Sequence, residues 1–105
     1  MSTYSVQSVI GGDVLKIRVP QDRQYLLFVV KTEDGEVSNV RFSNTDNTPI
    51  KIDFSDLDIH IIYDPDTEIT SLGEFEYVTK IDGGYEIFGD FGIIWVFCDY
   101  CSPKL

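Results

Sequence analysis

Residues 24–43 read QYLLFVVKTEDGEVSNVRFS, and this stretch carries the pattern that decides the fold class. Residues 24–31 are apolar along nearly their whole length, which is typical of a strand covered on both faces. Asp34 and Gly35 favour the positive φ angles of a type I′ turn between two antiparallel strands. Residues 37–43 form the predicted return strand. The stretch therefore predicts a central β-hairpin.

Strand patterns continue on both sides of this hairpin. Before it, Leu15, Ile17 and Val19 alternate with Lys16 and Arg18, as expected for a strand with one face in water. A short helix near residues 53–60, capped by Ser55, is the alternative for one later segment. The further strands are expected over residues 50–54, 57–63, 74–81, 85–91 and 93–100.

The composition supports the same fold class. The strand formers Val, Ile, Thr, Tyr, Phe and Trp total 43 residues, whereas Leu, Met, Glu, Gln, Lys and Arg total 24. The chain of 105 residues shows no internal repeat, so we expect a single domain over residues 1–105. The prediction is an all-β domain of about eight strands, arranged as an antiparallel sandwich, a barrel or a strongly curved sheet.

The net charge excludes two large classes of partner. The chain has 18 acidic and 8 basic residues and a formal charge of −10. Nucleic-acid binding requires clustered cations, and an anionic membrane surface attracts them for the same reason. The longest apolar runs, LLFVV and IIWVFC, are too short to span a bilayer. We expect a cytoplasmic protein that binds neither nucleic acid nor membrane.

The acidic residues are concentrated in one part of the sequence. Residues 1–31 contain four basic and two acidic side chains, whereas residues 32–105 contain 16 acidic and four basic ones. No Lys or Arg occurs in the 28 residues from Ile52 to Thr79. This segment supplies the predicted partner-binding residues, which are Asp53, Asp56, Asp58, Tyr63, Asp64, Asp66, Glu68, Glu74, Glu76 and Tyr77.

The pattern of these residues suggests an interaction surface. Alternation along a strand would place Asp56 and Asp58 on one face, and Glu74 and Glu76 likewise. Carboxylates accelerate association with a basic protein, and tyrosines bind Arg or Lys by hydrogen bonds and cation–π contacts. The alternative interpretation is a solvated surface that serves solubility. Trp95 falls in an apolar run and is predicted to lie in the core.

Three patterns that could carry metal or catalytic chemistry are incomplete. Residues 64–68 place acids at positions 1, 3 and 5 of a calcium loop, but Ile69 and Phe75 occupy positions 6 and 12. Cys98 and Cys101 form a C-x-x-C at the end of the last strand, where we expect packing cysteines. His60 can pair with Asp58, but is expected to be a surface histidine.

These observations predict a protein that is not an enzyme and needs no cofactor or metal. The preferred hypothesis is an acidic immunity or antitoxin-type protein that neutralises a basic bacterial toxin, such as a nuclease, by occluding its cationic active site. A small-ligand or calcium-binding β domain is the alternative. An enzyme using carboxylates has the least support, because no nucleophile and base can be named together. No pattern in the sequence indicates an oligomeric state.

Overall fold

The computed structural model describes residues 5–105. Within them the 3₁₀ helix η1 (Val6–Val9) precedes ten strands: β1 (Asp13–Arg18), β2 (Tyr25–Lys31), β3 (Val37–Ser43), β4 (Lys51–Asp53), β5 (Ile62–Asp64), β6 (Ile69–Ser71), β7 (Phe75–Ile81), β8 (Gly84–Gly89), β9 (Gly92–Phe97) and β10 (Tyr100–Ser102). The predicted all-β class is confirmed, with two strands more than expected. None of the described helical residues forms a segment long and apolar enough to cross a membrane.

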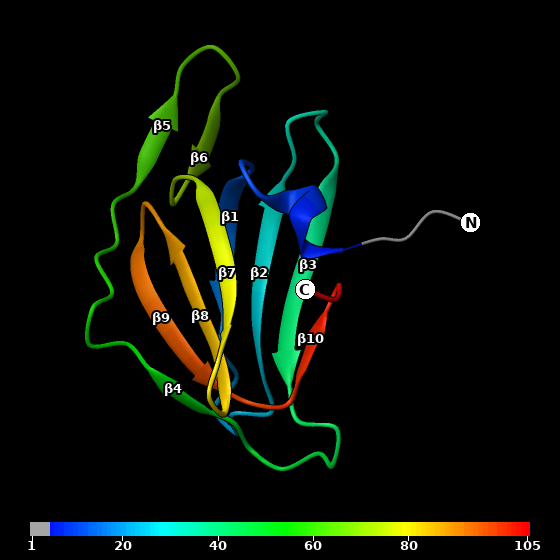
Figure 1. Cartoon of the computed structure of the whole chain (residues 1–105). Helices are drawn as coiled ribbons and strands as arrows, with labels where there is room; N and C mark the ends of the chain where they lie inside the picture. Colours follow the sequence, from blue (N-terminus) through cyan, green and yellow to red (C-terminus); the bar gives the residue numbers. More distant parts are fainter. Residues whose placement is uncertain (1–4) are drawn as a thin grey trace.

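Two four-stranded antiparallel sheets pack face to face as a sandwich (Figure 1). The first sheet has the strand order β1-β2-β3-β10, and the second has the order β4-β9-β8-β7. Strands β5 and β6 form a separate hairpin that extends beyond the end of both sheets (Figure 1). The sandwich is one of the three architectures that the strand pattern predicted.

The core consists of side chains from the inner faces of both sheets. Along β2 every second residue is fully buried, and the residues between them are half-buried. Phe28 on β2 makes an edge contact with Phe75 on β7, with ring centroids 5.3 Å apart. The rings of Phe42 and Tyr85 are tilted at 59° with centroids 5.4 Å apart, and they join β3 to β8. Aromatic contacts of this kind hold the two sheets together.

The hairpin between β2 and β3 forms as predicted, but with a different turn. The Thr32 N–H donates to the Glu36 carbonyl at 2.7 Å, and the Gly35 N–H donates to the Thr32 carbonyl at 2.9 Å. Gly35 has a φ of 89°, whereas Asp34 does not adopt a positive φ. The Asp34 carboxylate accepts hydrogen bonds from Thr32 and Glu36, which stabilise the turn. The connection is therefore a three-residue loop ending in a left-handed glycine, and type I′ was wrong.

Residues 54–61 form neither the predicted strand nor the alternative helix. An Asp53 side-chain oxygen accepts the Ser55 N–H at 2.9 Å, so the chain turns at the point where Ser55 would have capped a helix. The Asp58 N–H donates to the Phe91 carbonyl at 2.7 Å, and the Ile93 N–H donates to the Asp56 carbonyl at 3.1 Å. These long-range bonds tie the segment to the β8–β9 turn and remove the local bonds that a helix needs.

Candidate protein-binding surface

Residues 56–68 form a solvent-exposed segment that we call the acidic arm. All its side chains except that of Leu57 are exposed. The arm leaves the second sheet after β4 and ends in the turn between β5 and β6, which projects beyond the sandwich (Figure 1). Its five carboxylates are those of Asp56, Asp58, Asp64, Asp66 and Glu68.

The arm is attached to the sandwich at its start, and the hairpin that carries its tip is attached to the sandwich at its base. Leu57 packs against the core, and it forms an isolated bridge with Gly92. Gly92 has a φ of 97°, and a Cβ atom there would clash with the Asp56 carbonyl oxygen. At the other end the Leu72 N–H donates to the Val14 carbonyl at 2.7 Å, which attaches the base of the hairpin to β1. A segment held at two points can present its side chains in a defined place.

Large apolar side chains lie exposed between the carboxylates of the arm. Ile61 is 75% exposed and Tyr63 is 58% exposed, and Ile59 and Ile62 are each more than two-fifths exposed. Burying such side chains releases free energy of about 25 cal/mol for each Å² of apolar surface. The arm therefore combines charge with side chains suited to the centre of an interface.

The negative charges of the arm are largely unbalanced by basic side chains of residues 5–105. His60 Nε2 lies 3.1 Å from Asp58 Oδ2, and this is the only ion pair among residues 5–105. The side chains of both residues are mainly exposed, so the pair that the sequence allowed lies on the surface. The Asp64 carboxylate accepts the Asp66 N–H at 2.9 Å, which orders the turn without neutralising its charge.

The structure divides the predicted partner-binding residues into two groups. The arm gathers six of them: Asp56, Asp58, Tyr63, Asp64, Asp66 and Glu68. Asp53 lies opposite Trp95 on the outer face of the second sheet. The register of β7 shifts between Phe75 and Tyr77, so the regular alternation on which the expected shared face of Glu74 and Glu76 depended is interrupted at Glu76.

The backbone of Glu74 is part of the structure of the sandwich. It lies opposite Asp13 in an isolated antiparallel bridge, and Asp13 is in turn opposite Lys31 in β2. The Glu74 N–H also donates to an Asp90 carboxylate oxygen at 2.8 Å. We therefore exclude Glu74 from the arm.

The outer face of the second sheet carries Tyr77, which was predicted as a partner-binding residue, beside three residues that the sequence did not indicate: Glu86, Phe88 and Trp95. Trp95 is half-buried there, so its predicted place in the core was wrong. Trp95 Nε1 donates to Glu86 Oε1 at 3.0 Å, and the Tyr77 hydroxyl donates to Glu86 Oε2 at 3.2 Å. Tyr77 and Phe88 stack at 5.1 Å. Residues 93–97 could have indicated this surface, because every one of them is apolar, whereas an antiparallel strand with one face in water normally alternates.

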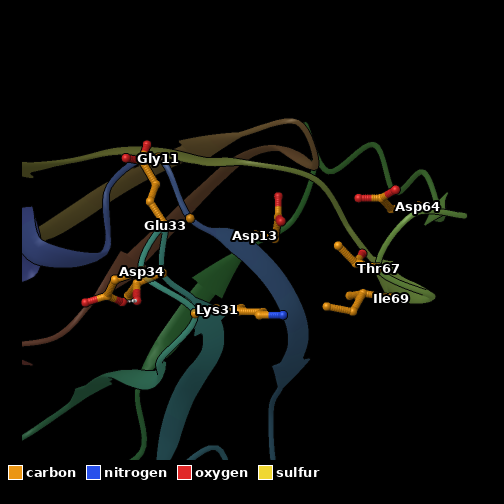
Figure 2. Close-up of a pocket in the computed structure, with 11 residues that line it drawn as sticks. Gly11, Asp13, Lys31, Glu33, Asp34, Asp64, Thr67 and Ile69 are labelled. Carbon is orange, nitrogen blue, oxygen red and sulfur yellow. Dashed lines mark hydrogen bonds between the residues drawn. The ribbon is translucent and has the colours of Figure 1, made fainter.

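An open cavity of about 330 Å³ lies between the β2–β3 turn and the β5–β6 turn at the end of the arm (Figure 2). Figure 2 shows Asp13 and Lys31 between the turn residues Glu33 and Asp34 and the arm residue Asp64. Within the described part of the chain, no three His, Cys, Asp or Glu side chains are grouped to hold a metal ion. Its lining contains the acidic residues Asp13, Glu33, Asp34 and Asp64 and one basic residue, Lys31, so it is an acidic recess beside the arm.

Cys98 and Cys101 are buried free thiols. Burial raises the pKa of both, and that of Cys101 reaches about 12. The Cys101 thiol donates to the Pro103 carbonyl at 3.2 Å. The nucleophile and metal ligand is the thiolate, which these surroundings disfavour. Both cysteines therefore have the environment of packing residues.

We expect the buried thiols to make the fold less stable at alkaline pH. In the unfolded chain a cysteine ionises near pH 8.5, whereas folded Cys101 keeps its proton until about pH 12. The folded state then binds more protons, so the free energy of unfolding falls as the pH rises above about 8.5. Urea unfolding of the wild type and Cys101→Val at several pH values measures this effect. An equal pH dependence in the two proteins would contradict it.

Comparisons with protein-family models, with curated proteins and with solved structures found no match for this chain. The function is therefore inferred from the charges, exposed side chains and packing of the chain itself.

Proposed function

We propose that this protein is a non-catalytic inhibitor of a basic bacterial protein, of the immunity or antitoxin type, and that the acidic arm makes the contact. The observation that carries this proposal is the arm itself, in which five carboxylates and four exposed apolar side chains lie within 13 residues. We place this function in the cytoplasm, where a cell must neutralise a toxin of its own.

The carboxylates suit a partner that binds nucleic acid. A nuclease presents Lys and Arg side chains to the phosphates of its substrate, and a series of carboxylates can occupy the same positions. Long-range attraction between the two charged surfaces raises the association rate by about 10- to 1,000-fold at low salt. The proposed inhibition therefore needs no chemical step and no cofactor.

The exposed apolar side chains of the arm supply binding affinity that its carboxylates alone do not. Exposed ion pairs contribute only about 0–1 kcal/mol each, whereas aromatic and aliphatic anchors buried at the centre of an interface contribute more. Ile61 and Tyr63 are the most exposed of the large apolar residues in the arm. We therefore assign affinity chiefly to these two residues and association rate to the surrounding carboxylates.

The distribution of charge favours an interaction surface over a general aid to solubility. Charge that serves solubility alone has no reason to separate by sign. In this sandwich the outer face of the first sheet carries half of the basic residues of the chain, and the arm carries none. The basic residues on that face are Lys16, Arg18, Lys31 and Arg41.

Affinity capture at two salt concentrations tests the proposed function. The whole chain is immobilised and exposed to a lysate of the organism that encodes it, and retained proteins are identified and purified. We expect a basic partner whose own activity the chain inhibits in a one-to-one complex. Its association rate should fall by about tenfold or more between low and physiological ionic strength. A neutral or acidic partner, or a rate independent of salt, would contradict the proposal.

A further inference from the structure

We propose that the outer face of the β4–β9–β8–β7 sheet binds an arginine side chain of the partner. We call this surface the aromatic platform, and it consists of Tyr77, Glu86, Phe88 and Trp95. It lies outside the acidic arm and supplies a second contact. The inference rests on the proposed function in one respect, namely that the arginine belongs to the basic protein that this chain is proposed to inhibit.

The register of the sheet places these residues side by side. Trp95 on β9 is directly opposite Glu86 on β8, and Asp53 on β4 is opposite Trp95 on its other side. Phe88 on β8 is opposite Tyr77 on β7, so it lies two residues along the strand from Glu86 and on the same face. The platform is therefore a set of rings around one carboxylate, with a second carboxylate at its edge.

The Glu86 carboxylate is held in place by its neighbours. Trp95 Nε1 donates to one of its oxygens at 3.0 Å, and the Tyr77 hydroxyl donates to the other at 3.2 Å. An ionised carboxylate accepts about four hydrogen bonds, so each oxygen retains capacity for another donor. Two acceptors at a fixed separation match the planar fork of a guanidinium group.

The charge around Glu86 is not neutralised within the protein. No Lys or Arg of residues 5–105 forms an ion pair with it. Lys80 on the neighbouring strand donates to the carbonyls of Ile81 and Gly84 and lies 5.1 Å from the Tyr85 ring, which belongs to the inner face. A carboxylate fixed between aromatic rings therefore attracts a cation from outside the chain.

Arginine fits this surface better than lysine does. Its guanidinium group is planar, stacks on aromatic rings and donates two parallel hydrogen bonds to a carboxylate. The ammonium group of lysine is more strongly hydrated and has no plane to stack. The chain already shows the stacking contact elsewhere, because the Arg41 guanidinium lies 4.4 Å from the centroid of the Tyr25 ring.

Two other occupants are less suited to the platform. A symmetric contact with a second copy would place two Glu86 carboxylates together, and each chain has a net charge of −10. A sugar ring could stack on Trp95, but it would leave the Glu86 charge without a counter-cation. Both occupants are outcomes that the experiment can detect.

The test uses a short peptide of alternating Gly and Arg and a matched peptide with Lys in place of Arg. Trp95 is the only tryptophan of the chain, so its fluorescence reports binding at the platform directly. We expect saturable binding of the arginine peptide, at least about fivefold tighter than that of the lysine peptide. Glu86→Gln should weaken arginine binding by at least about fivefold.

Matched variants separate this proposal from general charge attraction. Glu33→Gln removes the same charge from an exposed residue on the β2–β3 turn and should leave the affinity unchanged. Thermal unfolding confirms that both variants are folded. A variant with Asp56, Asp58 and Asp66 changed to Asn should still bind the peptide, so failure of the arm and failure of the platform are distinguishable.

Four results would overturn the inference. The first is equal affinity for the two peptides, and the second is an equal effect of Glu86→Gln and Glu33→Gln. The third is a fluorescence change with a neutral oligosaccharide but not with the arginine peptide. The fourth is a concentration-dependent dimer in sedimentation that Glu86→Gln strengthens.

Discussion

Replacing Phe28 with alanine is expected to destabilise the sandwich by about 3–5 kcal/mol. Phe28 is fully buried on β2, and its ring contacts Phe42 of the same sheet and Phe75 and Phe91 across the core. Removal of the ring deletes contacts to both sheets at once, and close-packed neighbours relax only partly into the space. A domain of this size is stable by only about 5–15 kcal/mol in total.

Urea unfolding measures this effect. With a slope of about 2 kcal/mol per M, the midpoint should move down by about 2 M. Val37→Ala is the matched control, because Val37 is 60% exposed at the start of β3 and its loss should change stability by less than about 0.5 kcal/mol. Equal midpoints for Phe28→Ala and the wild type would mean that the two sheets are not joined through this ring.

The elements that follow local rules could be predicted from the sequence. Residues 37–43 were expected as a strand, and β3 spans the same residues. Turn signals at residues 64–66 and 82–84 also lie where the chain turns. A strand with a strict period and a turn with glycine depends on neighbours in the chain, so periodicity and composition identify it.

Segments held by distant partners could not be predicted in this way. Residues 54–61 alternate like a strand, yet their backbone is bonded to Phe91 and Ile93, more than 30 positions along the chain. The sequence of this segment contains no pattern that indicates those bonds. The irregularity in β7 near Glu76 is similar, because one shifted residue moves the following side chains to the other face.

The candidate site shows the same division. Counting charges located the acidic arm, because no tertiary contact is needed to find a run without Lys or Arg. The aromatic platform required knowledge of which strands are neighbours. Glu86 and Trp95 are nine positions apart and meet only through the pairing of β8 with β9.

Neutralising the arm is expected to slow association with the basic partner by about tenfold or more at low salt. The variant carries Asp56→Asn, Asp58→Asn and Asp66→Asn, three exposed residues whose side chains donate or accept no hydrogen bond within the core. Each substitution removes electrostatic attraction that acts before the two proteins touch, so the association rate should fall more than the dissociation rate rises. The difference from the wild type should shrink at high salt, where screening already removes that attraction.

The control for this variant changes the same net charge at the opposite end of the sandwich. Asp22, Asp46 and Asp82 lie exposed in the loops after β1, β3 and β7, far from the β5–β6 hairpin (Figure 1). Their change to Asn also raises the formal charge by three, so a partner that responded only to total charge would slow equally with both variants. We expect the control to bind at nearly the wild-type rate, because the field that guides a partner depends on where the charges lie. Equal slowing by both variants, measured by stopped-flow or biosensor kinetics at low ionic strength, would remove the arm from the binding surface.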